Sequence, residues 1–445
     1  MTAARPGKTL LSKGAPALDL ADGEADALFS EALARACAEV GKVSSALLLP
    51  PDLTRLHSRA GFLTVIAHRE LSKAGIAVTI MPALGTHAPL CAASRARMFP
   101  GVPDALFRDH DWRRDVAELA RIEREWVEKA TEGAADFDWP VQVNRLLRDG
   151  GFDLIVSLGQ VVPHEVVGMA NHAKNIFVGT GGKEAIDKSH FASAVYGMEK
   201  MMGRIDTPVR AMFDEGMNRC AGKLPPVLYA LTALSARGGD EGMGRTAGSA
   251  LALCGLYCGF GRECFERAAA LSRQVNIELL DEPIQKAVVY LDPEEFRSTW
   301  LGNKAIYRTR MAMADGGELL VIAPGIERFG EDARLDALIR KHGYRPAKTV
   351  CEKTAGDEEL AGNLSAAAHL IHGSSEGRFT VRYCPGPGLS RREIESVGFE
   401  WGDISEAAAH YKIGELAAGW NAGRGGERFF FVPNPALGLW ALSAP

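Results

Sequence analysis

Residues 46–84 read ALLLPPDLTRLHSRAGFLTVIAHRELSKAGIAVTIMPAL. The apolar segments 46–49 and 76–84 are typical of buried strands in a parallel sheet. Between them, Phe62, Ile66 and Leu71 fall near helical spacing. A strand, a crossover helix and a second strand form a βαβ unit, so the stretch predicts an α/β fold. Residues 152–158 form a further apolar segment and predict another strand.

Polar side chains follow each of these predicted strands. Asp52, Thr54 and Arg55 come after the first strand, His87 follows the second, and His164 follows the third. In an open α/β sheet, ligands bind at the carboxyl ends of the strands, where the loops meet. We therefore expect these five residues to gather around one binding site.

A second α/β block begins near residue 281. It predicts strands over 286–292, 318–324, 378–384 and 428–434, and a helix over 294–317. The division is therefore a domain over 1–280 and a smaller one over 281–445, whose last segment can pack back on the first. We expect the active site in the cleft between the two domains.

The composition is that of a globular protein. The chain has 445 residues, 47% of them hydrophobic and 24% charged, with a net charge of -5, which gives no electrostatic basis for binding nucleic acid or an anionic membrane. The apolar run 248–261 is shorter than the roughly 20 residues of a spanning helix. The N-terminal residues lack the apolar core of a signal peptide, and eight cysteines fit reduced thiols. We expect a cytoplasmic protein.

The segment from His164 to His190 combines three histidines with four glycines. Glycine permits positive φ and a close approach to a ligand, and neighbouring Lys or His side chains can meet a phosphate or a metal. A glycine-rich turn before a solvated helix is the alternative reading. The sequence GTGGK is not a Walker A loop, because its spacing differs. The four glycines are Gly168, Gly179, Gly181 and Gly182.

Two other groups of residues are less specific. Cys254, Cys258 and Cys264 lie at near-helical intervals in an apolar run without zinc-site spacing, which favours packing over metal binding. His110 and Trp112, in DHDWRRD, either line a substrate pocket or form a helix cap with a satisfied histidine.

Several of these residues together resemble the nickel-pincer-nucleotide enzymes typified by lactate racemase. The motifs stand in the family's order and cover most of the first two-thirds of the chain. They are Asp52-Leu53-Thr54-Arg55, Gly85-Thr86-His87, His164 followed by Lys174 and His190 at separations of ten and sixteen, and Thr207-Pro208-Val209-Arg210.

The resemblance implies a Rossmann-like first domain and a covalently held cofactor. This is the nickel-pincer nucleotide, pyridinium-3,5-bisthiocarboxylic acid mononucleotide nickel, joined to the enzyme through Lys174. His190 would be the protein's nickel ligand, and sulfur donors with imidazole suit nickel. Asp52, Thr54, Arg55 and Gly179 would shape the cofactor site.

The resemblance also implies an isomerase that inverts C2 of a 2-hydroxy acid. His87 and His164 would be the acid/base pair, and Arg55 and Lys304 would contact the substrate; whether Arg55 holds a carboxylate or the cofactor phosphate stays open. Removing hydride is easier than removing a proton from carbon beside a carboxylate. Return of hydride to either face of the planar keto acid requires two bases, and imidazoles titrate near neutrality.

The chain departs from the family pattern in two places. Asn171, His172 and Ala173 precede Lys174 where the family has two glycines, so His172 is either a supporting donor or a turn residue, and Lys183 is a rival attachment site. In the second domain Lys304 is kept, but Leu301 replaces a glutamine. The loss predicts a substrate other than lactate, such as a longer hydroxy or sugar acid.

Two other functions fit the same residues. The protein could be a hydroxy-acid oxidoreductase that uses this cofactor, or a non-catalytic protein that binds it. The expected partners are a small 2-hydroxy acid and the proteins that make the cofactor. The sequence predicts no oligomeric state.

Overall fold

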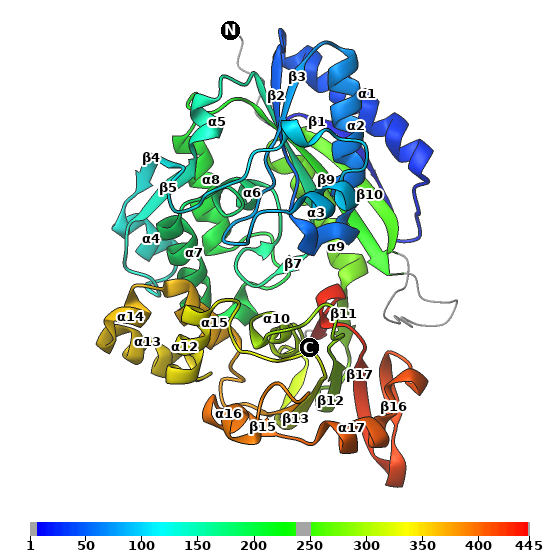
Figure 1. Ribbon diagram of the computed structural model, residues 1–445, viewed down its shortest axis with the longest axis vertical. Coiled ribbons are helices and arrows are strands. Elements are labelled where there is room, and N and C mark those ends of the chain that lie inside the picture. Colours follow the sequence, from blue (N-terminus) through cyan, green and yellow to red (C-terminus); the bar gives the residue numbers. More distant parts are fainter. Residues whose placement is uncertain (1–6, 237–250, 444–445) are drawn as a thin grey trace. The chain divides into compact units, whose positions relative to one another are not determined.

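The computed structural model describes residues 7–236 and 251–443. The chain divides into two compact units (Figure 1). Of the described residues, 7–189, 201–235 and 251–275 form the first unit, and 190–200, 236 and 276–443 form the second. Each unit combines helices with a six-stranded sheet that contains parallel strands, which confirms the α/β class.

The sheet of the first unit has a parallel core. Strands β3, β2, β6 and β9 run parallel, and β1 pairs antiparallel with β10 at the other edge. The predicted βαβ unit is confirmed as β2, α2 and β3. The sheet order is β1 (Thr9–Gly14), β10 (Leu251–Phe260), β9 (Val227–Ala236), β6 (Leu154–Gln160), β2 (Ser45–Leu49) and β3 (Ala77–Ile80).

Two helices pack together against this sheet (Figure 1). Phe29 of α1 (Asp22–Val40) and Ile66 of α2 (Ala60–Lys73) share one core with Leu48 and Val156 of the strands. All four side chains are at most 2% exposed. Burial of this apolar stripe, rather than helix propensity, stabilises the two helices.

The strand order creates a crevice in the first sheet. From β2 the chain crosses to β3 on one side, and it later returns to β6 on the other side of β2. The loops that leave β2 and β6 therefore diverge, which is the switch point where α/β proteins bind ligands. Asp52 follows β2 and His164 follows β6.

Smaller elements surround the sheet of the first unit. β4 and β5 form an antiparallel pair, and α6 packs against α8. The bounds are α3 (Ala92–Met98), β4 (Val116–Ile122), α4 (Arg124–Ala130), β5 (Trp139–Asn144), α5 (Arg145–Asp149), β7 (Pro163–His164), β8 (Gly168–Met169), α6 (Ala173–Phe177), α7 (Lys183–Tyr196), α8 (Pro208–Arg219) and α9 (Arg262–Asn276).

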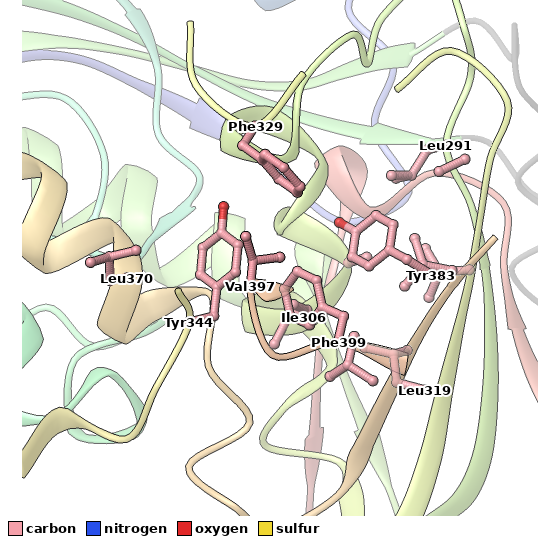
Figure 2. Packing of buried hydrophobic residues seen from close by; sticks show 14 of the residues in the cluster. Leu291, Ile306, Leu319, Phe329, Tyr344, Leu370, Tyr383, Val397 and Phe399 are labelled. Carbon is pink, nitrogen blue, oxygen red and sulfur yellow. The ribbon is translucent and has the colours of Figure 1, made fainter. Parts of the chain in front are cut away.

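The second unit has its own sheet and core. All its neighbouring strands run parallel except β16, which is antiparallel to β17. Figure 2 shows the centre of the core, where Tyr344, Tyr383 and Phe399 gather with aliphatic side chains. The sheet order is β15 (Glu400–Trp401), β14 (Thr380–Pro385), β13 (Met313–Ala323), β12 (Ile284–Tyr290), β17 (Arg428–Val432) and β16 (Gly419–Ala422).

Helices α12 to α15 of the second unit pack mainly on one another. A separate parallel pair is formed by β11 and β18. The bounds are β11 (Ile277–Leu280), α10 (Thr299–Gly302), α11 (Lys304–Thr309), α12 (Ala333–His342), α13 (Ala347–Gly356), α14 (Glu358–Ala361), α15 (Leu364–His372), α16 (Arg391–Ser396), α17 (Ile404–Tyr411) and β18 (Leu439–Leu442).

The prediction of one helix over 294–317 is wrong. The segment forms the short helices α10 and α11, and from Met313 it is already part of β13. Gly316 has φ +77°, and a Cβ on Gly317 would stand 2.9 Å from the carbonyl oxygen of Gln285. The backbone there lies too close to a neighbouring strand for a helix to continue.

Two further predictions need correction. The regular strand within the predicted 76–84 is only β3, although Met81 and Ala83 beyond it still donate to the carbonyls of Leu48 and Pro50, at 2.9 and 2.7 Å. Cys254 and Cys258 lie on β10 and not at helical intervals; they are free and buried, as is Cys264. Residues 248–250 of that apolar run lie outside the described residues.

Within the described parts of the chain, none of the helices has the length and apolarity that a membrane crossing requires.

Candidate functional site

The loop after β2 is organised by Asp52. Its side chain is buried and caps the 3-10 helix Leu53–Ser58, accepting from the backbone N–H of Thr54 at 3.2 Å and from the Thr54 hydroxyl at 2.5 Å. Arg55 lies at a kink inside this helix, with φ -113° and ψ 29°. Its backbone N–H donates to the carbonyl of Asp52 at 3.0 Å, but its guanidinium makes no hydrogen bond or ion pair with any residue in the described ranges. Its guanidinium is therefore available to an anionic ligand.

His87 is joined to the other oxygen of Asp52. Its Nδ1 is hydrogen-bonded to Asp52 Oδ2, while 52% of the His87 side chain is exposed. Burial favours a higher pKa for Asp52, but the hydrogen bond and charge of His87, together with Thr54 and Arg55, hold that pKa below its ordinary value. The ionised carboxylate can only accept, so Nδ1 of His87 carries a proton and Nε2 is the nitrogen left for chemistry.

His164 is held in the opposite tautomer. It ends β7, is 6% exposed, and its Nδ1 accepts a hydrogen bond from the backbone N–H of Val166 at 3.1 Å. A neutral His164 therefore carries its proton on Nε2. The carboxylate of Glu165 stands 3.8 Å from Nδ1.

Lys174 lies on α6, which is anchored at the crevice of the sheet. The neighbouring Asn175 donates from its amide to the carbonyl of Leu49 at 3.1 Å and to the hydroxyl of Ser157 at 2.9 Å, so α6 is tied to both β2 and β6. These two bonds place the Lys174 backbone at the switch point.

The amine of Lys174 is electrostatically unusual. The residue is half-buried, and its Nζ has no hydrogen bond or ion pair to the part of the chain that the structure describes. Burial, with the charge of Arg55 and a smaller effect of Arg210, lowers the pKa of Lys174 to about 8, against the opposing charges of Glu165 and Asp52. About a tenth of this amine is uncharged, and hence nucleophilic, at pH 7, far more than for an ordinary lysine.

Gly179 connects two of the loops. Its carbonyl accepts from the N–H of Gly85, which has φ +59°, at 2.9 Å. A Cβ on Gly179 would stand 2.3 Å from the carbonyl oxygen of Asn175 and 2.6 Å from Cβ of Ala83. Only glycine permits this packing between the His87 loop and the end of α6.

His110 is a satisfied core histidine. It is 3% exposed; its Nδ1 accepts from the Asn144 amide at 2.9 Å, and its Nε2 therefore donates to the carbonyl of Gly181 at 3.0 Å. Arg113 stacks on the ring of Trp112, 3.6 Å from its centroid. His110 thus holds the glycine-rich turn that precedes α7.

Lys183 and His190 both lie on α7. Lys183 forms an ion pair with Asp187 one turn later, so its amine differs from that of Lys174 in having a carboxylate partner. His190 is partly buried and is the residue at which the second unit begins.

Lys304 begins α11 in the second unit. Its Nζ lies 5.7 Å from the ring centroid of Phe296. Asn303 beside it is fully buried, and its side-chain oxygen accepts from the hydroxyl of Tyr383 at 2.8 Å.

The first unit thus brings several of the expected residues together. Asp52, Thr54 and His87 share hydrogen bonds, and Lys174 lies within electrostatic reach of Asp52 and Arg55. Sequence reasoning did not find the anchoring role of Asn175, and an amide directly beside the lysine was the only signal for it. In residues 7–236 and 251–443 no three His, Cys, Asp or Glu side chains are grouped as a metal site.

Comparison with known proteins gives one family. The model of the lactate racemase N-terminal domain matches residues 30–202. No curated protein matches the chain.

Two solved structures have a similar fold. A protein from Thermotoga maritima has a TM-score of 0.77 and 22% identity, over 96% of this chain and 100% of that one. The lactate racemase apoprotein from Thermoanaerobacterium thermosaccharolyticum has a TM-score of 0.68 and 13% identity, over 97% of this chain and 100% of that one. At these identities the structures establish the fold, and the family model supplies the relationship. Residues 30–202 are thus similar to the lactate racemase N-terminal domain, and the chain as a whole has the fold of the lactate racemase apoprotein.

Proposed function

We propose that the protein is an isomerase that racemises or epimerises C2 of a 2-hydroxy acid. The observation that carries the proposal is the hydrogen-bonded pair of Asp52 and His87 at the crevice where Lys174 is anchored. A general base and a nucleophilic amine at one switch point fit hydride-transfer chemistry on a covalently held cofactor.

The two histidines carry their protons on opposite ring nitrogens. His87 has its proton on Nδ1, facing Asp52, so Nε2 is free to take the hydroxyl proton of one enantiomer. His164 accepts at Nδ1 and presents a proton on Nε2, so it can donate to the carbonyl oxygen of the 2-keto acid. Inversion in one direction needs one base and one acid, and in the reverse direction their roles exchange.

The residues around Lys174 fit the nickel-pincer nucleotide. The Lys174 amine, with a pKa of about 8 and no partner among the described residues, is suited to be the residue through which the cofactor would be held covalently. Arg55 is free to bind a phosphate or carboxylate, and Gly179 leaves no side chain between the loops. When bound, the cofactor would supply the hydride acceptor.

One protein ligand suffices for a metal that the cofactor itself carries. Following the family pattern, we assign that role to His190, whose imidazole suits nickel beside sulfur donors. The described residues offer no protein-only site of three ligands, so the proposed nickel depends on the cofactor for its other donors.

The substrate we propose is longer than lactate. Following the family pattern, we assign Lys304 to the substrate, and Arg55 either to the substrate carboxylate or to the cofactor phosphate. Leu301, where the family has a glutamine, removes an amide donor and favours an acid with a different pattern of hydroxyl groups. The expected partners are this substrate and the proteins that make and load the cofactor.

The test uses the full chain co-produced with cofactor-making proteins. Peptide mass spectrometry is expected to place an adduct on Lys174, with about one nickel per chain, and chiral chromatography is expected to show inversion of aldonic acids. An adduct on Lys183, or no adduct, would contradict the assignment. Net release of keto acid without inversion would favour the oxidoreductase, and loading without turnover of any acid would favour a binding protein.

His87→Asn and His164→Asn test whether both histidines act in acid/base catalysis and not in cofactor loading. Each variant is expected to load the cofactor normally and to lose on the order of 10²- to 10⁴-fold in inversion of both enantiomers. Substrate deuterated at C2 is expected to keep its deuterium in the product, because hydride does not exchange with solvent. Wash-out of deuterium would contradict hydride transfer.

A further inference from the structure

The turn that leads into Lys174 is strained. Asn171 has φ 72°, and His172 has φ 58° and ψ -135°. Neither residue is glycine, and the values at His172 belong to a region that L-residues rarely adopt. Strain of this kind persists only when surrounding contacts hold it.

A buried arginine makes two of the contacts that hold this turn. Arg210, on α8, is fully buried, and it donates from Nη1 to the carbonyl of Asn171 at 3.1 Å and from Nη2 to the carbonyl of Met169 at 2.5 Å. Thr207 caps α8 by accepting from the backbone N–H of Arg210 at 3.2 Å, which fixes where the guanidinium begins. The planar fork of arginine spans two carbonyls in a way that lysine cannot.

The ring of His172 completes the anchor. Its centroid lies 4.2 Å from the ring centroid of Tyr229 and 5.2 Å from that of Phe265. The guanidinium of Arg210 also stacks on Phe265, 4.5 Å from its centroid. His172 then accepts at its carbonyl from the N–H of Asn175 at 2.9 Å, the first bond of α6. A continuous series of contacts therefore connects Arg210 to the helix that carries Lys174.

We propose that Arg210 is a positioning residue, which holds the strained turn at Asn171 and His172 and thereby keeps the Lys174 amine half-buried in its place near Asp52 and Arg55. The inference rests on the proposed function only for the use of Lys174 as the attachment point. The contacts of Arg210 and His172 involve protein groups alone and do not depend on a bound cofactor.

The consequence is a measurable property of the Lys174 amine. The charged groups that act on it are Arg55, Glu165, Asp52 and Arg210, with burial as the largest cause of its lowered pKa of about 8. If the turn is released, the amine moves toward water and its pKa rises toward the ordinary value of about 10.4. A midpoint one pH unit higher leaves about tenfold less uncharged amine at pH 7.

The experiment is peptide-resolved acylation of the cofactor-free chain by acetic anhydride as a function of pH. Wild-type Lys174 is expected to become reactive with a midpoint near pH 8. Arg210→Met and Arg210→Lys are both expected to raise this midpoint and to speed amide exchange at Asn175. Arg262→Met is the matched control, because Arg262 pairs with Asp214 beside this cluster and makes no bond to the turn; it is expected to leave the midpoint unchanged.

Arg210→Lys keeps the charge and loses the fork, and it covers the case in which Arg210→Met does not fold. A folded Arg210→Lys protein with the wild-type midpoint and exchange rate would overturn the proposal, since charge alone would then suffice. An equal rise in the acylation midpoint of Lys174 in the Arg262→Met protein would overturn the proposal as well. Absence of a cofactor adduct on Lys174 would refute the proposed function but leave this result standing, so the two failures are distinguishable.

Discussion

The carboxylate of Asp52 contacts Nδ1 of His87 and also accepts from the hydroxyl of Thr54. Because the carboxylate can only accept, it fixes the imidazole tautomer whose Nε2 is basic. Asp52→Asn is expected to lower kcat on the order of 10²- to 10⁴-fold, since the amide can donate to Nδ1 and turn the proton to the wrong nitrogen. Cofactor occupancy is measured by mass spectrometry, and kcat is expressed per loaded molecule, because Asp52 also lies in the loop assigned to the cofactor site.

Thr54→Val is the control for Asp52. It removes one hydrogen bond to the same carboxylate and leaves the bond to His87, so its effect on kcat is expected to stay within about tenfold. Equal losses in the two variants would mean that the loop, rather than the tautomer of His87, is what Asp52 maintains.

Gly179 is expected to tolerate no side chain. In Gly179→Ala the new methyl group meets the carbonyl of Asn175 and Cβ of Ala83, so either α6 or the His87 loop must move. We expect a loss of about 1–3 kcal/mol in the free energy of unfolding, measured in urea, and a lower fraction of Lys174 carrying cofactor. Gly356→Ala is the control, because a Cβ there meets nothing within 4 Å. Normal loading of Gly179→Ala would refute the close packing.

His110 is expected to matter for stability and not for chemistry. His110→Phe leaves the Asn144 amide and the Gly181 carbonyl without their partner, which costs about 1–3 kcal/mol in the free energy of unfolding. His110→Gln keeps one donor and is expected to lose less. Activity per folded molecule is expected to change by far less than in the His87 or His164 variants. A loss as large as theirs would place His110 against the substrate.

The sequence predicts the elements that carry the crevice because their signals are local. The apolar segments before Asp52 and His164 are buried strands, and helical spacing between 60 and 73 marks α2 correctly. Polar residues placed directly after such strands meet at one edge for topological reasons. No long-range information is needed for that step.

Other features could not be predicted because they depend on distant partners. The helix predicted over 294–317 extends past Met313, yet pairing with β12 and β14 makes that end a strand. The partners of Arg210 are backbone carbonyls, and a sequence does not reveal which carbonyl a guanidinium will reach. The sequence shows that Asn171 and His172 stand where the family has glycines. That these two residues adopt strained, positive φ angles is known only from the structure.

His172 makes the stability of the protein depend on pH. Burial, and then the charges of Arg210 and Arg262, hold the pKa of His172 well below its usual value, although the backbone of Gly261 opposes them. Asp214, 3.9 Å from Nδ1, is the acidic group that faces the ring. The folded protein therefore keeps His172 neutral, whereas the unfolded chain takes up a proton as the pH falls below about 6.5.

Stability from this residue is complete above that pH and is lost below it, at up to about 1.4 kcal/mol per pH unit. His172→Phe keeps the packing against Tyr229 and removes the titration. Urea unfolding between pH 7 and pH 5 is expected to show a fall in the free energy of unfolding that is about 2 kcal/mol smaller in the variant than in the wild type. All other ionisable groups are present in both proteins, so their contributions cancel in the difference. If the free energy of unfolding fell equally with pH in the two proteins, His172 would be protonated in the folded state, with Asp214 as its counter-ion.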